Sequence, residues 1–124
     1  MGLTVLLALL ALGAPVATPA GDWRGTSLCQ VHPSPCNDEQ AAYHISAAGN
    51  GFHMVMNKIV GGEEQGMGTL EASYDGPSAT LAGTTHDRQG RPGEWRFVLA
   101  GDRLSGTLTV GGIVYRRIEV RRTH

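Results

Sequence analysis

The sequence lacks the features that mark several large classes of protein. Its longest apolar run, residues 5–12, is too short to cross a bilayer, which needs roughly 20 apolar residues. It has no glycine-rich phosphate-binding loop, and no Ser or Cys nucleophile with a recognisable base at motif spacing. Asp38-Glu39 is an acidic pair, but neighbours on a strand point to opposite faces and cannot share a substrate. We therefore expect that the protein is not an enzyme and uses no cofactor.

The chain also lacks a net charge of either sign. Ten basic side chains stand against eleven acidic ones, a balance that argues against nucleic acid as a partner. Acidic residues dominate before Gly76, and arginines dominate after it. The last segment carries Arg116, Arg117, Arg121 and Arg122. These arginines form either an anion-binding patch or a solvated strand face.

Residues 1–20 have the pattern of a signal peptide. The apolar run is followed by Gly13 and Pro15, and Thr18-Pro19-Ala20 offers a small-x-small cleavage site. No cysteine follows closely, so we expect no stable membrane anchor. The alternative is a buried N-terminal helix. We expect an exported protein, periplasmic or secreted, with residues 21–124 as its single domain.

Cys29 and Cys36 are the only cysteines, and in an exported chain they most simply pair with each other. Their C-x6-C spacing fits neither the redox C-x-x-C motif nor a zinc knuckle. A domain of this size buries a limited fraction of its surface and benefits from a covalent link. We therefore predict a disulfide that clamps the turn containing Pro33 and Pro35.

Alternation of apolar and polar residues predicts strands along the whole domain. The expected strands are 23–28, 40–47, 52–60, 66–74, 78–85, 95–99, 104–110 and 113–122. With no credible helix and with tight turns between them, they predict an all-β fold. The expected architecture is an eight-stranded antiparallel up-and-down barrel, which removes sheet edges by closing on itself.

Two hairpin turns predict the strand register. Asn50-Gly51 is expected to be a two-residue type I′ turn that places Tyr43 across from Lys58. Gly101-Asp102 is expected to place Phe97 across from Gly106.

Along the last strand, the apolar positions expected to face inward change from odd to even residue numbers. Ile113 and Tyr115 match the inward pattern, whereas Ile118 and Val120 do not. We expect a β-bulge near Arg116-Arg117, because a bulge shifts the face of everything beyond it.

Gly21-Asp22-Trp23 resembles the G-x-W that begins the first strand of lipocalins and other calycins. This resemblance implies a lipocalin- or avidin-like barrel in which Trp23 closes one end. It also implies that an arginine of the last strand, Arg121 or Arg122, packs across the indole.

The chain from residue 21 onward is also similar to small exported bacterial proteins of uncharacterised function. The shared features are W-x-G at Trp23, the two early cysteines, Asp38-Glu39, M-G-x-L at 67–70 and G-T-L at 106–108.

The inward-facing residues define a candidate ligand site, although they also suit a packed core. The expected lining residues are Tyr43, Met54, Met56, Lys58, Tyr74 and Trp95. Lys58, the only lysine, is expected near one rim with Glu39. There it forms a rim salt bridge, guards against edge pairing, or meets the carboxylate of an amphipathic ligand.

Two functions remain open from the sequence. The first is a barrel that binds a small apolar or amphipathic ligand in its lumen. The alternative is an inhibitor or protein-interaction module that acts on a hydrolase. His44 and His53 stand too far apart along the sheet to share a metal ion, so no metal site is expected. We expect a monomer.

Overall fold

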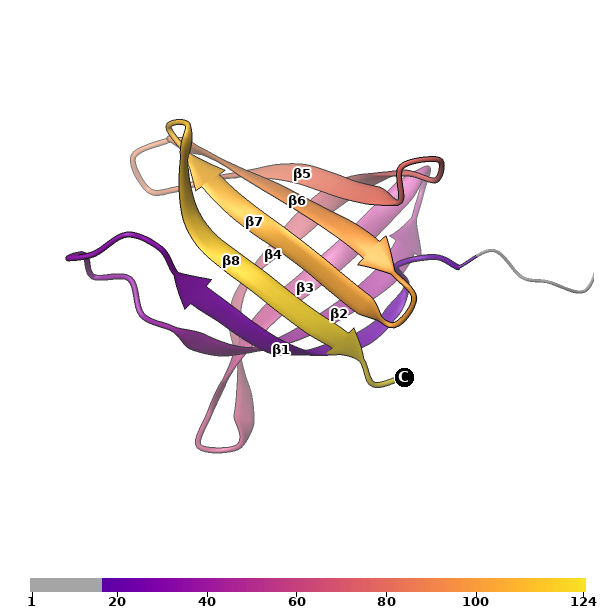
Figure 1. Cartoon of the computed structure of the whole chain (residues 1–124), viewed down its shortest axis with the longest axis horizontal. Helices are drawn as coiled ribbons and strands as arrows, with labels where there is room; N and C mark the ends of the chain where they lie inside the picture. The colour runs from indigo at the N-terminus through magenta and orange to yellow at the C-terminus, as the bar shows by residue number, and fades with distance from the viewer. Residues whose placement is uncertain (1–16) are drawn as a thin grey trace, which may run out of the picture.

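The computed structural model describes residues 17–124, which form a closed antiparallel barrel of eight strands in sequence order (Figure 1). The strands are β1 (Gly21–Cys29), β2 (Glu39–Ala48), β3 (Gly51–Val60), β4 (Glu63–Asp75), β5 (Thr80–His86), β6 (Pro92–Ala100), β7 (Arg103–Val110) and β8 (Ile113–Arg122). β1 also pairs with β8, which closes the barrel. The predicted fold class is confirmed. Residues 1–16 of the expected signal peptide lie outside the described residues.

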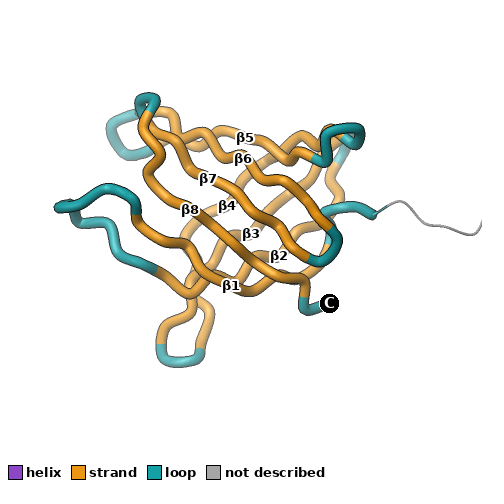
Figure 2. The backbone as a smooth tube through the Cα atoms, in the orientation of Figure 1, coloured by secondary structure: helices purple, strands orange, loops and turns teal. Residues whose placement is uncertain are grey.

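Turns and loops join the strands, and the described part of the chain contains no helix (Figure 2). Within residues 17–124, nothing forms a helix long and apolar enough to cross a membrane.

Alternate side chains of each strand fill the interior. The most deeply buried large side chains are at most 1% exposed, and they are Trp23, Met54, Leu70, Leu81, Phe97, Leu104 and Val120. Burying each such side chain contributes roughly 1.5–3 kcal/mol. The centre of the barrel is therefore a packed core, as in other eight-stranded barrels whose interior is filled by side chains.

One hairpin has the predicted register and the other does not. In the β6–β7 hairpin, Phe97 pairs with Gly106, as predicted. In the β2–β3 hairpin the turn is Gly49-Asn50, so Tyr43 pairs with Met56 and the predicted pairing with Lys58 is wrong. Gly49 has a φ of 57°, whereas Asn50 has no positive φ. This pattern fits a type II′ turn, which places glycine at its first central position.

A bulge in β8 lies one residue before the predicted position. Leu108 pairs with Arg116 and Thr109 with Val114, which leaves Tyr115 as the extra residue. Arg116 therefore shares the inward face with the buried residues further along β8. Ile113 pairs with Val110, which has the inward parity of Leu104 and Leu108, as predicted, but it is 64% exposed because it lies at the rim beside the β7–β8 turn.

A second bulge, in β4, was not predicted. Met56 pairs with Gly68 and Asn57 with Gly66, so Met67 is the extra residue and is exposed. The bulge moves the residues before Met67 to the opposite face of the sheet. Gly66 therefore leaves the inward face that carries Gly68 and Leu70.

Candidate functional site

One end of the barrel, the sealed end, is closed by Trp23 at the start of β1. Trp23 is fully buried, and its indole Nε1–H donates to the carbonyl oxygen of Pro19 at 3.0 Å. The guanidinium carbon of Arg122 lies 4.4 Å from the centroid of the indole ring. Of the two arginines expected to pack on Trp23, Arg122 does so, whereas Arg121 is exposed on the outer wall.

The segment before β1 completes this closure. Pro19 is fully buried. Arg122 donates from Nη1 to the carbonyl oxygen of Ala20 and from Nη2 to that of Thr18 at 3.0 Å. Its Nε donates to Asp102 at 3.2 Å. A small molecule therefore has no open route into the barrel past Trp23.

The core behind this closure leaves no continuous lumen. Phe97 packs edge-on against Tyr43 and stacks with Trp95, each with ring centroids 6.3 Å apart. Met54 is fully buried in the core, and Tyr74 packs edge-on against Phe52. Met54 and Tyr74 therefore do not line an accessible site. Of the two alternatives for the lumen, packing by side chains holds for the centre of the barrel.

The opposite end, which we call the mouth, contains a cavity of about 160 Å³. Its lining residues are Ser27, Glu39, Ala41, Tyr43, Met56, Asn57, Met67, Trp95, Leu108 and Arg116. Tyr43, Met56 and Trp95 were expected to line a ligand site, and the fold brings these three together here. The indole Nε1–H of Trp95 donates to Oγ1 of Thr85 at 2.9 Å.

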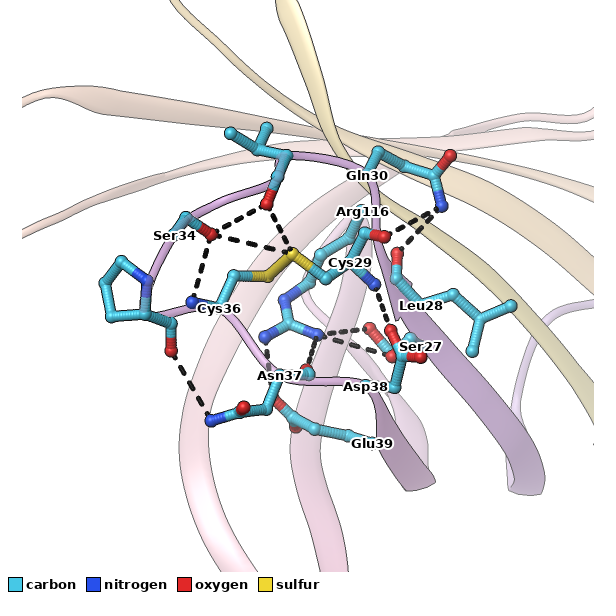
Figure 3. Close-up of polar contacts among 12 residues, drawn as sticks. Ser27, Leu28, Cys29, Gln30, Ser34, Cys36, Asn37, Asp38, Glu39 and Arg116 are labelled. Atoms are coloured by element: carbon cyan, nitrogen blue, oxygen red, sulfur yellow. Dashed lines mark hydrogen bonds and ion pairs between the residues drawn. A yellow bond between two sulfur atoms is a disulfide. The ribbon is translucent and has the colours of Figure 1, made fainter.

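A partly buried ion pair lies at the edge of this cavity (Figure 3). Nη2 of Arg116 and Oε1 of Glu39 are 2.8 Å apart, with side chains only 14% and 18% exposed. Nη1 of Arg116 also donates to the carbonyl oxygens of Asn37 at 3.0 Å and Ser27 at 3.3 Å. The arginine thus joins β8 to the end of β1 and to the segment just before β2.

The disulfide clamps the loop beside this ion pair. Cys29 and Cys36 are bonded, as predicted. The backbone N–H of Cys29 donates to Asp38 at 2.8 Å, and Ser34 donates to the carbonyl oxygen of Val31 at 2.8 Å. The loop that borders the mouth is therefore held by one covalent bond and several hydrogen bonds (Figure 3).

Arg116 is the functional candidate that sequence reasoning missed. It was expected in the bulge and among the arginines of an anion patch or a solvated strand face, and Glu39 was expected beside Lys58. The sequence feature that could have identified Arg116 is the change of the inward positions in the last strand from odd to even residue numbers. If the bulge is placed one residue earlier, Arg116 falls on the inward face. Sequence alone does not settle which of two neighbouring residues is the extra one.

Tyr43 keeps its proton at the base of the mouth. Burial raises the pKa of its hydroxyl far above the usual value, and the negative charge of Glu39 raises it further. Arg116 and a hydrogen bond to Ser27 act in the opposite direction but do not outweigh burial. The hydroxyl is therefore a neutral polar group at any ordinary pH.

Lys58 lies on the inward face near the rim. It pairs with Ala41, which is buried, so the two side chains leave the same face of the sheet. Lys58 makes no ion pair with any residue in 17–124, and it is not among the residues that line the inner cavity, where Glu39 is paired with Arg116. The predicted neighbour on β2 was wrong, but the predicted face is consistent with the pairing.

A larger groove of about 530 Å³ continues outward from the mouth. It is bordered by Val31, by the loop after β5, and by Val110, Ile113 and Tyr115 of the β7–β8 hairpin. Leu108 lines both this groove and the inner cavity. A ligand at the mouth therefore meets a small inner cavity and a wider apolar shelf.

The described residues offer no metal site, since no group of three or more His, Cys, Asp or Glu side chains is arranged to hold an ion. His44 lies between Asp22 at 2.7 Å and Glu64 at 2.6 Å, with a different carboxylate on each ring nitrogen. His53 pairs separately with Glu71.

Comparisons with protein-family models, with curated proteins and with solved structures found no match to this chain. The fold and the mouth define it as a small closed antiparallel barrel with one disulfide. That architecture is consistent with a lipocalin-like fold.

Proposed function

We propose that the protein is an exported, non-enzymatic barrel of the lipocalin type that binds a small amphipathic carboxylate at its mouth. The observation that carries this proposal is a largely apolar cavity at the end of the described barrel that Trp23 does not seal. Lys58, two residues beyond the cavity-lining Met56 on β3, faces inward near the same rim and has no ion pair within residues 17–124. The disulfide supports an oxidising, exported location.

The apolar part of the ligand is divided between two spaces. The inner cavity of about 160 Å³ has room for only a short group, since one water molecule occupies ~30 Å³ in the liquid. Met56, Met67, Trp95 and Leu108 give it adaptable apolar walls. The remainder of a longer chain would lie on the outer shelf, which begins at Leu108.

The charge at the mouth favours an anionic head group. Glu39 is neutralised by Arg116 at 2.8 Å, so the carboxylate does not repel a second anion strongly. Lys58 is the inward-facing charge at this rim that remains uncompensated. A ligand carboxylate would supply its partner.

A test measures binding of dodecanoate by displacement of a fluorescent fatty acid. Lys58→Met should weaken dodecanoate binding roughly threefold to tenfold, as expected for a partly exposed charged hydrogen bond. Lys58→Arg is the matched control, because it keeps a positive charge at the same position and should retain dodecanoate binding. Dodecanol should be insensitive to both changes. Unchanged dodecanoate binding in Lys58→Met, or no binding to the wild type, would overturn the proposal.

A second candidate function is a module that binds a hydrolase and inhibits it. The apolar side chains of Val60, Met67 and Ile113 are exposed at or near the mouth, as a protein-binding rim would require. Native mass spectrometry of protein purified from its own source separates the two. A bound small molecule favours the first function, and a co-purifying hydrolase favours the second.

A further inference from the structure

The outer wall of the barrel carries a concentration of positive charge that the mouth does not use. β1, β8, β7 and β6 lie side by side, on the near side of the view in Figure 1. Their outward positions carry five exposed arginines, which we call the arginine face: Arg24, Arg96, Arg103, Arg117 and Arg121.

Three of these arginines form a continuous row across three strands. Arg121 pairs directly with Arg24 on one side and with Arg103 on the other. Side chains in such positions have Cβ atoms about 5 Å apart, and like charges placed there are destabilising. Arg103 has a partner in Glu119 at 3.2 Å, and Arg24 lies 3.7 Å from Glu64. Arg121 has no ion pair within residues 17–124. The stability of the fold therefore does not account for this row.

A second row lies further along the same wall. Thr107 of β7 pairs with Arg96 on one side and with Arg117 on the other. On β8 this row is four residues from Arg121, which corresponds to roughly 13 Å at ~3.3 Å per residue. The arginine face thus presents an array of cations rather than one concentrated anion pocket.

Exposed apolar side chains lie among these cations. A shallow groove of about 530 Å³ runs across the wall, and Leu28 and Val98 line it with Arg96 and Arg117. Both apolar side chains are exposed. Among the acidic residues at outward positions of these strands, Glu119 is paired with Arg103 and Asp22 with His44, and Glu94 lies two residues from Arg96 along β6.

We propose that the arginine face docks reversibly on an anionic phospholipid surface. Guanidinium groups match phosphate oxygens in a bidentate geometry, and several of them in an array can engage several head groups at once. Exposed apolar side chains between the cations favour an interface that has both charge and an apolar layer beneath it. The overall charge of the chain is −1, so docking depends on the distribution of charge and not on its sum.

Binding is measured by co-sedimentation with vesicles of phosphatidylglycerol and phosphatidylcholine at low salt. Each unpaired arginine near such a surface contributes roughly fivefold to the partition coefficient. Arg121→Gln and Arg117→Gln should each lower it by about that factor, and the double variant by about 25-fold. Arg88→Gln removes the same charge from the loop after β5 and should change binding less than twofold. Binding should fall steeply with added salt.

Three results would overturn the proposal. The first is equal partitioning onto vesicles of phosphatidylcholine alone. The second is an equal effect of Arg121→Gln and Arg88→Gln. The third is tight binding of inorganic polyphosphate by protein that does not sediment with the anionic vesicles, which would assign the face to a soluble polyanion. Near-ultraviolet circular dichroism of every variant verifies that the barrel remains folded, so a loss of binding reports on the face itself.

Discussion

Arg122, from the end of β8, lies over the indole of Trp23, from the start of β1, with its guanidinium carbon 4.4 Å from the ring centroid. The same guanidinium group binds the carbonyl oxygens of Thr18 and Ala20. One side chain therefore covers the aromatic ring, ties down the segment before β1, and supports the β1–β8 seam that closes the barrel.

Trp23→Ala should lower the free energy of unfolding by ~3–5 kcal/mol, because it removes a fully buried aromatic side chain. Arg122→Met keeps an apolar cover but loses the charge on the ring, so its effect through the indole should be ~0.5–2 kcal/mol. Urea unfolding monitored by far-ultraviolet circular dichroism measures both. A Trp23→Ala variant as stable as the wild type would show that the indole does not seal the barrel.

Residues 18–20 should stabilise the fold, although the sequence predicts a cleavage site directly after them. A chain that begins at Gly21 loses the carbonyl oxygen of Pro19 and leaves the buried indole Nε1–H of Trp23 without its partner. We expect it to be less stable than a chain beginning at Ala17 by ~1–3 kcal/mol. The comparison requires only two purified proteins and a urea titration. Equal stability would mean that the segment is dispensable.

Gly51→Val should destabilise the protein by ~1–3 kcal/mol, through overpacking. The sequence suggested a positive φ as the reason, but Gly51 follows the turn and has no positive φ. A Cβ atom at Gly51 would lie 2.3 Å from the carbonyl oxygen of Ala72. Gly76→Val is the matched control, because a Cβ there meets nothing within 4 Å and its φ is not positive. Similar melting temperatures for the two variants would contradict this explanation.

His44 should make stability depend on pH. Hydrogen bonds to Asp22 first and to Glu64 second raise its pKa above 6.5 in the folded state. A group whose pKa rises on folding stabilises the protein fully below its unfolded pKa and loses that contribution as pH rises through the folded pKa. The urea midpoint should therefore fall as pH rises from about 6.5 through the raised pKa of His44. This decline should be smaller in His44→Gln, and an unchanged pH profile in that variant would exclude His44 as its source.

The sequence predicted the barrel well because the alternation of apolar residues and the length of each turn act together. Any two-residue turn pairs odd-numbered residues of one strand with even-numbered residues of the next, wherever the turn lies. The inward faces of β2 and β3 were therefore predicted correctly although the turn is Gly49-Asn50. The exact pairing was not predictable, because Gly49, Asn50 and Gly51 all suit a tight turn. For the same reason Lys58 was placed across from the wrong neighbour.

The mouth was only partly predictable. Tyr43, Met56 and Trp95 could be assigned to the interior from alternation alone, but alternation does not say at which depth the core ends. The pairing of Glu39 with Arg116 depends on a bulge at Tyr115 and on contacts between residues far apart in the chain. No local pattern in the sequence specifies either of these.

The two tryptophans of the chain allow the most direct test of binding at the mouth, since Trp95 lines the cavity there and Trp23 seals the other end. Dodecanoate is titrated into ¹⁵N-labelled protein, and the two indole N–H resonances are followed by nuclear magnetic resonance. We predict that the Trp95 resonance shifts to saturation while the Trp23 resonance stays in place. If neither resonance moves, or if that of Trp23 moves and that of Trp95 does not, the mouth is not the binding site.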